Sequence, residues 1–239
     1  TAQVQSSLFS ATRLHVQAAL DRGEFSQALL LLSDWYGDPS LSPSETQEIN
    51  GLLSQLAGSV IYSTEHRLEP PYLVQAGERL ETIAEKYEIP WQLLAKINGI
   101  TSADQLTPGQ ELKVVRGPFS ALIDLSQHTL TLMLDRRYAG KFSLNFDPGM
   151  NVEEGHWEVN QKLLTPANVS MAGVGGASEE RSLTIASIDQ GVSQVAILRG
   201  ATTSNPVTEP AGRVLRMSSA DAEDVFDILS LGSKVVIRR

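Results

Sequence analysis

The sequence contains no cysteine in 239 residues. Disulfide bonds, thiolate metal sites and a cysteine nucleophile are therefore excluded. Long apolar stretches are also absent: the longest uninterrupted aliphatic run covers residues 28–32, whereas a helix needs roughly 20 apolar residues to cross a bilayer. We expect no membrane span within this chain. Since the chain begins at Thr1 with no charged-then-apolar leader, any signal or anchor is expected upstream of it.

Basic residues are outnumbered, with 19 Lys and Arg against 28 Asp and Glu, a net charge of -9 and a pI of about 4.9. No local cluster of lysine or arginine reverses this balance, so nucleic acid is not an expected partner. The acidity lies mainly at the N-terminal end, where residues 1–70 hold 3 basic and 8 acidic residues. The 41% of apolar residues exclude wholesale disorder. The length of 239 residues favours one large domain or two to three small ones.

Residues 1–68 are predicted to be helical. Apolar residues recur every three or four positions up to Gly23, and a second stripe runs over residues 25–35. Residues 42–45 form a capping box with proline at the first helical position, and a third stripe follows it. The pattern resembles a tetratricopeptide-like helix hairpin with one added helix. A packing or spacer role is the plain interpretation, and a platform for a protein partner is the alternative.

Residues 72–115 are predicted to fold in the order strand, helix, helix, strand. Asn98-Gly99 suits a left-handed cap at the end of the second helix, and Pro108-Gly109 suits a turn into the last strand. The segments YLVQAGERLETIAEKYEIPWQLLAKINGI and LTPGQELKVV resemble the lysin motif (LysM) over its whole length. The resemblance implies a glycan-binding domain over residues 70–117.

The LysM resemblance implies that N-acetylglucosamine-containing glycans of peptidoglycan bind between two loops. It places the contacts at Ala76, Gly77, Glu78, Arg79, Gly99, Ile100 and Thr101. Backbone amides near the glycine suit acetamido oxygens, and small apolar residues suit the methyl group. The pair Glu78-Arg79 departs from the Asp-Thr common in the family, which leaves affinity open. Leu80, Ile83 and Trp91 are expected in the core.

Residues 118–239 are predicted to be mostly β. Apolar or alternating runs are separated by turns, and one late helix begins after Ser218-Ser219 with acidic residues in its first turn. Gly232 ends this helix, and a last strand follows. We therefore expect a sandwich or barrel with one late helix, which makes the whole chain an α+β multidomain protein.

Four stretches of this region resemble the L,D-transpeptidase domain, which cross-links bacterial peptidoglycan. ALIDLSQHTLTLML is similar to the opening hairpin of the family, and EEGHWEVNQKLLTP to its glycine-led strand. AILRGAT is similar to the strand that normally ends in His-Gly-Thr. GRVLRMSSADAEDVFDILSLGSKVVI is similar to the signature Ser-x-Gly-Cys-Ile-Arg-Met with its helix and final strand.

The resemblance also exposes what is missing from the active site of the family. Val214 stands in the place of the nucleophilic cysteine and Arg199 in that of the histidine, while Gly200 and Arg216 persist. Ala211 and Arg213 replace the serine and glycine of the signature. Valine offers no nucleophile, and a guanidinium cannot serve as a general base near neutral pH. The family reaction is therefore not expected to run.

Two alternatives remain open for this region. A hydroxyl of Thr202, Thr203, Ser204 or Ser218 would be a relocated nucleophile, although no histidine lies near these residues in the sequence. Arg199 and Arg216 would form a cationic cleft for the carboxylates of stem peptides. Against that stands a structural interpretation, with Arg216 paired to Asp221 or Asp224 and Arg199 on the surface.

Other motifs are weak. The four histidines lie at no metal-ligand spacing. Glu154, His156 and Glu158 would share one strand face, which favours a solvated face over a metal site. Residues 173–176 are glycine-rich without a lysine or a helix start, which favours a flexible loop over a phosphate cradle. We expect no metal and no cofactor.

These observations predict a peptidoglycan-binding protein of the cell envelope. Its expected domains are a helical segment over 1–68, a LysM domain over 70–117 and a catalytically inactive L,D-transpeptidase-like domain over 118–239. The alternatives are an active transpeptidase or carboxypeptidase with an unconventional nucleophile, and a wall-tethered scaffold that docks a protein through residues 1–68.

Overall fold

The computed structural model describes residues 2–102, 106–146, 149–165, 180–189, 194–200 and 213–239. The chain divides into two compact units. The first comprises Thr1–Pro118 together with Leu132–Gly140, and the second comprises Phe119–Thr131 with Lys141–Arg239. The helical and LysM segments expected from the sequence therefore lie in one compact unit, and a short piece of the β-rich region belongs to the same unit.

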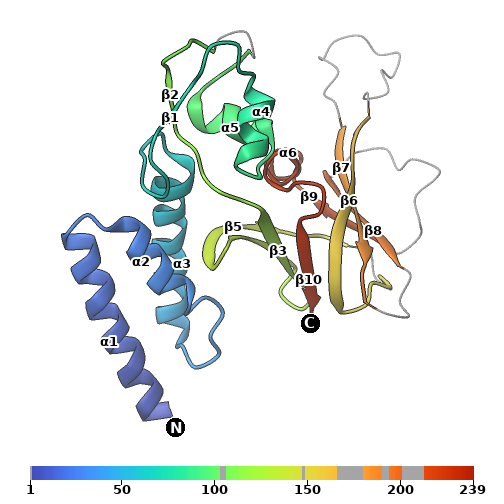
Figure 1. Ribbon diagram of the computed structural model, residues 1–239. Helices are drawn as coiled ribbons and strands as arrows, with labels where there is room; N and C mark the ends of the chain where they lie inside the picture. The colour runs from blue at the N-terminus through green and yellow to red at the C-terminus, as the bar shows by residue number, and fades with distance from the viewer. Residues whose placement is uncertain (1, 103–105, 147–148, 166–179, 190–193, 201–212) are drawn as a thin grey trace, which may run out of the picture. The chain divides into compact units, whose positions relative to one another are not determined.

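The first unit begins with helices (Figure 1). They are α1 (Ala2–Asp21), α2 (Phe25–Ser33), α3 (Pro43–Ala57) and the π-helix η1 (Gly58–Tyr62). Gly23 adopts a φ of 72° just after α1, a conformation that glycine reaches without steric cost. The capping box forms as expected, since the Glu45 amide donates to Ser42 Oγ and the Ser42 amide donates to the Glu45 carboxylate.

The tip of a β-hairpin packs on these helices within the first unit. The Tyr138 amide donates to Ser33 Oγ over 2.8 Å, and the Tyr62 hydroxyl donates to the Ala139 carbonyl over 2.8 Å. Arg136 and Asp34 form an ion pair at 2.6 Å. The helical segment therefore uses part of its surface to hold residues 132–140.

The rest of the first unit has the expected strand, helix, helix, strand order. Its elements are β1 (Tyr72–Leu73), α4 (Leu80–Lys86), α5 (Trp91–Asn98) and β2 (Glu111–Leu112). The strands pair antiparallel, with Tyr72 opposite Leu112. Leu80, Ile83 and Leu94 are fully buried between them, so the apolar stripes predicted from the sequence form the core of this small fold.

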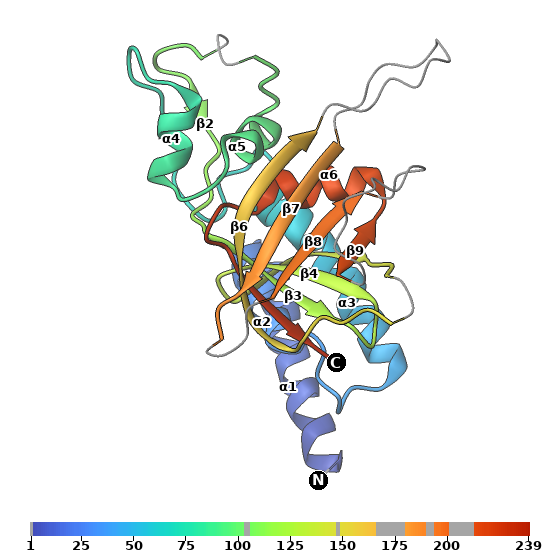
Figure 2. The ribbon, with the colours of Figure 1, turned by 90° about the vertical axis from the view of Figure 1, so that its right-hand side faces the viewer.

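The β-rich region folds into one eight-stranded sheet in the order β5-β4-β3-β10-β6-β7-β8-β9. The strands are β3 (Phe119–Asp124), β4 (Thr129–Leu134), β5 (Arg137–Ser143), β6 (Gly155–Thr165), β7 (Glu180–Ser187), β8 (Val195–Gly200), β9 (Val214–Met217) and β10 (Lys234–Arg238). Figure 2 shows β6, β7 and β8 side by side. The β10–β3 and β8–β9 pairs are parallel, and β10–β6, β6–β7 and β7–β8 are antiparallel.

The sheet curls, and one helix lies on it. Arg216 in the edge strand β9 forms a β-bridge with Asn145, two residues beyond the other edge strand β5. Helix α6 (Ser219–Ile228) packs on β7 and β8. Its first turn is capped by Ser218 Oγ, which accepts from the Asp221 amide over 3.0 Å.

The predicted α+β class, with helices first and one late helix in a mostly β region, is confirmed. The β-rich part is a single curled sheet rather than a two-sheet sandwich. Sequence patterns did not predict β9, because a strand of four residues is too short to show a recognisable alternation of apolar and polar residues. In the part of the chain that the structure describes, every helix is too short or too polar to cross a bilayer.

Candidate functional site

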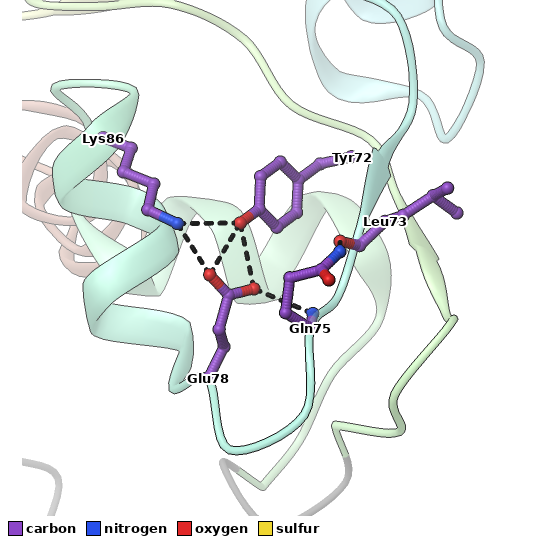
Figure 3. A network of polar contacts seen from close by, with 5 residues as sticks. All are labelled: Tyr72, Leu73, Gln75, Glu78 and Lys86. Carbon is purple, nitrogen blue, oxygen red and sulfur yellow. Dashed lines mark hydrogen bonds and ion pairs between the residues drawn. The ribbon is translucent and has the colours of Figure 1, made fainter.

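The first predicted glycan-binding loop follows β1, and Glu78 holds it together (Figure 3). Both carboxylate oxygens of Glu78 accept from the Tyr72 hydroxyl, over 2.8 and 2.9 Å. The Gln75 amide donates to the same carboxylate over 2.9 Å, and Lys86 Nζ donates over 2.6 Å. Glu78 therefore stabilises the conformation of the loop through these hydrogen bonds.

The electrostatics of Glu78 follow from these partners. The hydrogen bond from Lys86, assisted by those from the Gln75 amide and the Tyr72 hydroxyl, lowers the pKa of Glu78 to about 2. The same contact raises the pKa of Lys86. Glu78 is consequently a carboxylate at any physiological pH. The other three residues of this loop, Ala76, Gly77 and Arg79, are exposed to solvent. Gly77 has a φ of 81°.

The second predicted loop begins where α5 ends. Gly99 adopts the left-handed conformation, with φ 64° and ψ 26°, and the Ile100 amide donates to the Ala95 carbonyl over 2.9 Å. The Asn98 side chain then ties this end to the strand side: its amide nitrogen donates to the Lys113 carbonyl over 2.9 Å, and its oxygen accepts from the Lys113 amide over 2.7 Å.

The two loops meet at the β-ladder. The Gly109 amide donates to the Val74 carbonyl over 2.8 Å, and the Val74 amide donates to the Gln110 carbonyl over 3.0 Å. The start of the first loop is thereby fixed beside the end of the second. Ala76, Gly77 and Gly99 are exposed, so the loops offer backbone amide and carbonyl groups there, and the first loop also exposes the charged side chain of Arg79.

In the second unit, β8 and β9 bring together the residues that the sequence resemblance assigns to the active-site positions of the transpeptidase family. Their parallel register sets Arg199 opposite Arg216 and Ile197 opposite Val214. Because side chains alternate along a strand, Arg199, Arg216 and Val214 share one face of the sheet. Gly200 lies on the other face, where an added Cβ would come within 3.2 Å of Ser219 Cα in α6.

Arg199 is engaged within the protein. Its side chain is only 6% exposed, and its Nη1 lies 3.0 Å from Oε1 of Glu180 at the start of β7. The alternative that places Arg199 on the surface is therefore wrong. Val214 is buried as well. This face of the sheet holds the ion pair of Arg199 and an aliphatic side chain.

Arg216 and Ser218 also have local roles. Arg216 exchanges two backbone hydrogen bonds of 2.7 Å with Asn145, and its side chain is half-buried. The Ser218 hydroxyl is the cap of α6.

Four other residues named from the sequence lie outside the described residues: Thr202, Thr203, Ser204 and Ala211. The glycine-rich residues 173–176 also lie outside them.

His156 and Glu158, which were considered together with Glu154 for a metal site, already have polar partners in the structure. His156 Nδ1 lies 3.2 Å from an Asp189 oxygen, and Glu158 pairs with Lys234. Across the residues that the structure describes, no three histidine, aspartate or glutamate side chains gather in a way that would hold a metal ion.

Comparison with known proteins identifies the domain that contains the two predicted glycan-binding loops. The family model for the LysM domain matches residues 72–115. Residues 72–115 form a LysM domain. Two curated relatives, both the N-acetylmuramoyl-L-alanine amidase sle1 of Staphylococcus epidermidis strains, are 31% identical to this chain over 119 residues. The match covers 46% of this chain and 36% of each relative, so the chain spans about a third of their length.

Solved structures similar to the chain include several L,D-transpeptidases. The enzyme from Mycobacterium smegmatis is 12% identical, with a TM-score of 0.35 over 55% of this chain and 64% of that one. An L,D-transpeptidase from Mycobacterium tuberculosis is 16% identical, with a TM-score of 0.37 over 56% and 64%. L,D-transpeptidase 3 of the same organism, bound to a faropenem-derived adduct, is 15% identical, with a TM-score of 0.37 over 58% and 66%.

Within the LysM domain, one prediction fails. Trp91 is not in the core, because it is 42% exposed at the start of α5, whereas Leu80 and Ile83 are buried as expected. Pro90 caps this helix in an extended conformation, so Trp91 is the first helical residue and has no preceding turn to cover it. The apolar stripe of α5 is Leu93, Leu94 and Ile97. Trp91 stands three residues before Leu94, so the helical spacing alone did not exclude it from the core.

Proposed function

We propose that the protein binds the glycan strands of peptidoglycan through its LysM domain. The match of residues 72–115 to the family carries this proposal. The contacts are expected at Ala76, Gly77, Glu78, Arg79, Gly99, Ile100 and Thr101, along the two loops that the ladder fixes at Val74 and Gly109. N-acetylglucosamine is the expected sugar, since exposed backbone amides suit its acetamido group.

Within this site Glu78 acts through the shape of the loop. Its carboxylate already accepts from Tyr72, Gln75 and Lys86. We therefore expect the glycan to contact the backbone of the first loop and not the Glu78 carboxylate. The departure from the Asp-Thr common in the family consequently changes how the loop is held, while the sugar-facing backbone is retained.

We propose further that the C-terminal region is an L,D-transpeptidase-like domain without catalytic activity. The sequence stretches that resemble the family, including the arginine and glycine that persist at 216 and 200, support the likeness. The ion pair between Arg199 and Glu180 supports inactivity. A guanidinium that is paired with a carboxylate cannot take a proton from a nucleophile, so it cannot replace the histidine as a general base. Val214 supplies no nucleophile.

A cell-envelope location accompanies this function, since peptidoglycan is found there. The curated relatives are named as amidases acting on N-acetylmuramoyl-L-alanine, which are enzymes of the same polymer. We propose that this protein uses the wall as a binding surface, with stem peptides as additional contacts and residues 1–68 as the segment available to a protein partner.

Incubation with tetrapeptide muropeptides, followed by mass spectrometry of the products, tests inactivity. We expect neither cross-linked dimers nor released D-alanine, with an active L,D-transpeptidase as the positive control. Either product would favour the alternative of an unconventional nucleophile. Ser218→Ala would then identify or exclude Ser218, whose hydroxyl accepts the cap hydrogen bond of α6.

A further inference from the structure

The second unit contains a pocket of about 380 Å³ that no part of the proposed function uses. It is lined by Leu125, Ser126, His128, Phe146, Gly149, Met150 and Arg239. Leu125 and Arg239 are the first residues after the parallel strands β3 and β10, so the pocket lies where both strands end. We propose that this pocket binds the carboxylate end of a short peptide whose last side chain is apolar.

Hydrogen bonds of the main chain fix the walls. The Leu125 amide donates to the Arg238 carbonyl over 2.8 Å, which joins the ends of β3 and β10. The Leu144 amide donates to the His128 carbonyl over 2.7 Å, which joins the start of β4 to the end of β5. Such a preformed site loses little conformational entropy when a ligand binds.

One wall is a pair of stacked rings. The centroids of His128 and Phe146 are 4.2 Å apart and their planes are 17° from parallel. His128 holds its ring there from a left-handed backbone conformation, with φ 55°, which is uncommon for a residue other than glycine. With Leu125 and the thioether of Met150, these rings provide a flat apolar surface for an aliphatic or aromatic side chain.

The charged group of the pocket is Arg239. Among the described residues, the contacts of its guanidinium are long, 3.5 Å from Nη2 to the Val152 carbonyl and 3.9 Å from Nη1 to Glu154, and its side chain is 56% exposed. A guanidinium has five N–H donors, so these contacts leave donors for a ligand. The fork of such donors matches a carboxylate, which accepts two parallel hydrogen bonds.

The surrounding charges favour the same ligand. None of the described residues that line the pocket is acidic. Two aspartates adjoin lining residues in the sequence: Asp124 accepts from the Gln127 amide at 2.8 Å and from Arg238 Nε at 3.1 Å, and Asp147 lies outside the described residues. Glu154 is 3.9 Å from Arg239 Nη1, which is longer than a hydrogen bond. A cation above apolar walls selects a molecule that carries one anionic group and one apolar group at short distance, and the end of a peptide chain is such a molecule.

The location gives the site a relation to the transpeptidase-like strands. Phe146 follows Asn145, whose backbone is bonded to Arg216 in β9. A peptide held in the pocket would therefore lie near the strand that carries Arg216, without needing the positions of Arg199 or Val214. The inference is independent of glycan binding by the LysM domain.

In the test, N-acetyl-alanyl-phenylalanine is titrated into the full chain. The same dipeptide with a C-terminal carboxamide is the uncharged control ligand. Titration followed by two-dimensional amide NMR is expected to shift the signals of residues 125–128, 146 and 149–150. The carboxamide is expected to bind at least about tenfold more weakly, because it lacks the charge that Arg239 recognises. Equal affinity of acid and amide, or shifts confined to other residues, would overturn the proposal.

Two variants with the same change in charge complete the test. Arg239→Gln is expected to weaken binding of the acid about tenfold, whereas Lys234→Gln, at the other end of β10 with a 62% exposed side chain, should leave it within about twofold. An equal loss of affinity in both variants would mean that only the net charge of the protein matters, which would contradict specific recognition by Arg239. The amide spectrum of each variant reports whether it remains folded.

Discussion

At the scale of single residues, Lys113 places a charged amine inside the first unit. Its side chain is among the largest that are fully buried. Nζ donates to the carbonyls of Val60, over 2.9 Å, and Glu65, so the residue joins the LysM domain to the end of the helical segment. Burial lowers the pKa of Lys113 to about 8, and the nearby charge of Arg67 adds to this shift.

This shift predicts a stability that depends on pH. The ordinary pKa of lysine, 10.5, applies to the unfolded chain, so between pH 8 and 10.5 the unfolded state binds more protons than the folded one. The free energy of unfolding contributed by Lys113 therefore rises with pH through that window. We expect the difference between the wild type and Lys113→Met to grow in favour of the wild type by about 1–2 kcal/mol from pH 7 to 9.5.

Urea unfolding at the two pH values measures this difference. Lys141→Met is the matched control, because Lys141 is exposed, and its difference from the wild type should not change with pH. Lys162 has a pKa lowered in the same direction, but it is present in every variant and cancels. A difference for Lys113→Met that stays constant or shrinks as pH rises would refute the assignment.

Trp91 gives a second prediction at this scale. It is 42% exposed, whereas Trp157 is 1% exposed and Trp35 packs edge-on against Phe9. We expect Trp91→Phe to remove most of the tryptophan emission that acrylamide quenches and to shift the remaining emission to shorter wavelength. Trp35→Phe is the control and should retain the quenchable part. The same quenching in Trp91→Phe and the wild type would place Trp91 in the core after all.

At the scale of elements, the contact between β8 and α6 depends on the absence of a side chain at Gly200. An added Cβ would lie 3.2 Å from Ser219 Cα and 3.4 Å from its Oγ, and the backbone there cannot move aside cheaply. Gly51 in α3 is the opposite case, with nothing within 4 Å of the added atom. The two glycines therefore form a matched pair.

We expect Gly200→Ala to lower the free energy of unfolding by about 1–3 kcal/mol, as overpacking does. Gly51→Ala should raise it by about 0.5–1 kcal/mol, because alanine favours a helix interior. Chemical denaturation of both variants measures the two effects. Gly200→Ala as stable as the wild type would show that α6 does not press on β8 as closely as the structure indicates.

Elements specified by neighbouring residues could be predicted from the sequence, and those specified by distant pairing could not. The capping box at residues 42–45 and the left-handed cap at Gly99 depend on local chemistry, and both form as predicted. The strand β9 depends on pairing with β8, which no local pattern encodes. The partner of Arg199 is Glu180 in another strand, and burial of an arginine is visible only once that strand is placed.

The candidate sites follow the same rule. The two LysM loops are close in sequence to the ladder that fixes them, so the motif indicates where they begin, and their role in glycan binding stays a prediction. The network around Glu78 was not predicted, although a glutamate eight residues before Lys86 and six after Tyr72 is a possible signal for it. The pocket lined by Leu125 and Arg239 joins chain segments more than 100 residues apart, which sequence patterns do not bring together.

At the scale of the whole molecule, the chain combines a LysM domain with an eight-stranded sheet in which Arg199 pairs with Glu180 and Val214 is buried. The acidic residues concentrate in residues 1–70, outside the two domains proposed to contact the wall. We retain the division into 1–68, 70–117 and 118–239 as a functional proposal. The hairpin residues 132–140 are an exception to it, because they pack with the helices.

Co-sedimentation of the full chain with purified insoluble peptidoglycan tests the central claim most directly. Ala76→Trp places a large side chain on the exposed first loop of the LysM domain, and Glu85→Trp places the same side chain on the exposed face of α4. We expect the wild type and Glu85→Trp to be retained in the pellet, and Ala76→Trp to bind roughly tenfold more weakly. Equal retention of all three, or none by the wild type, would contradict glycan binding through these loops.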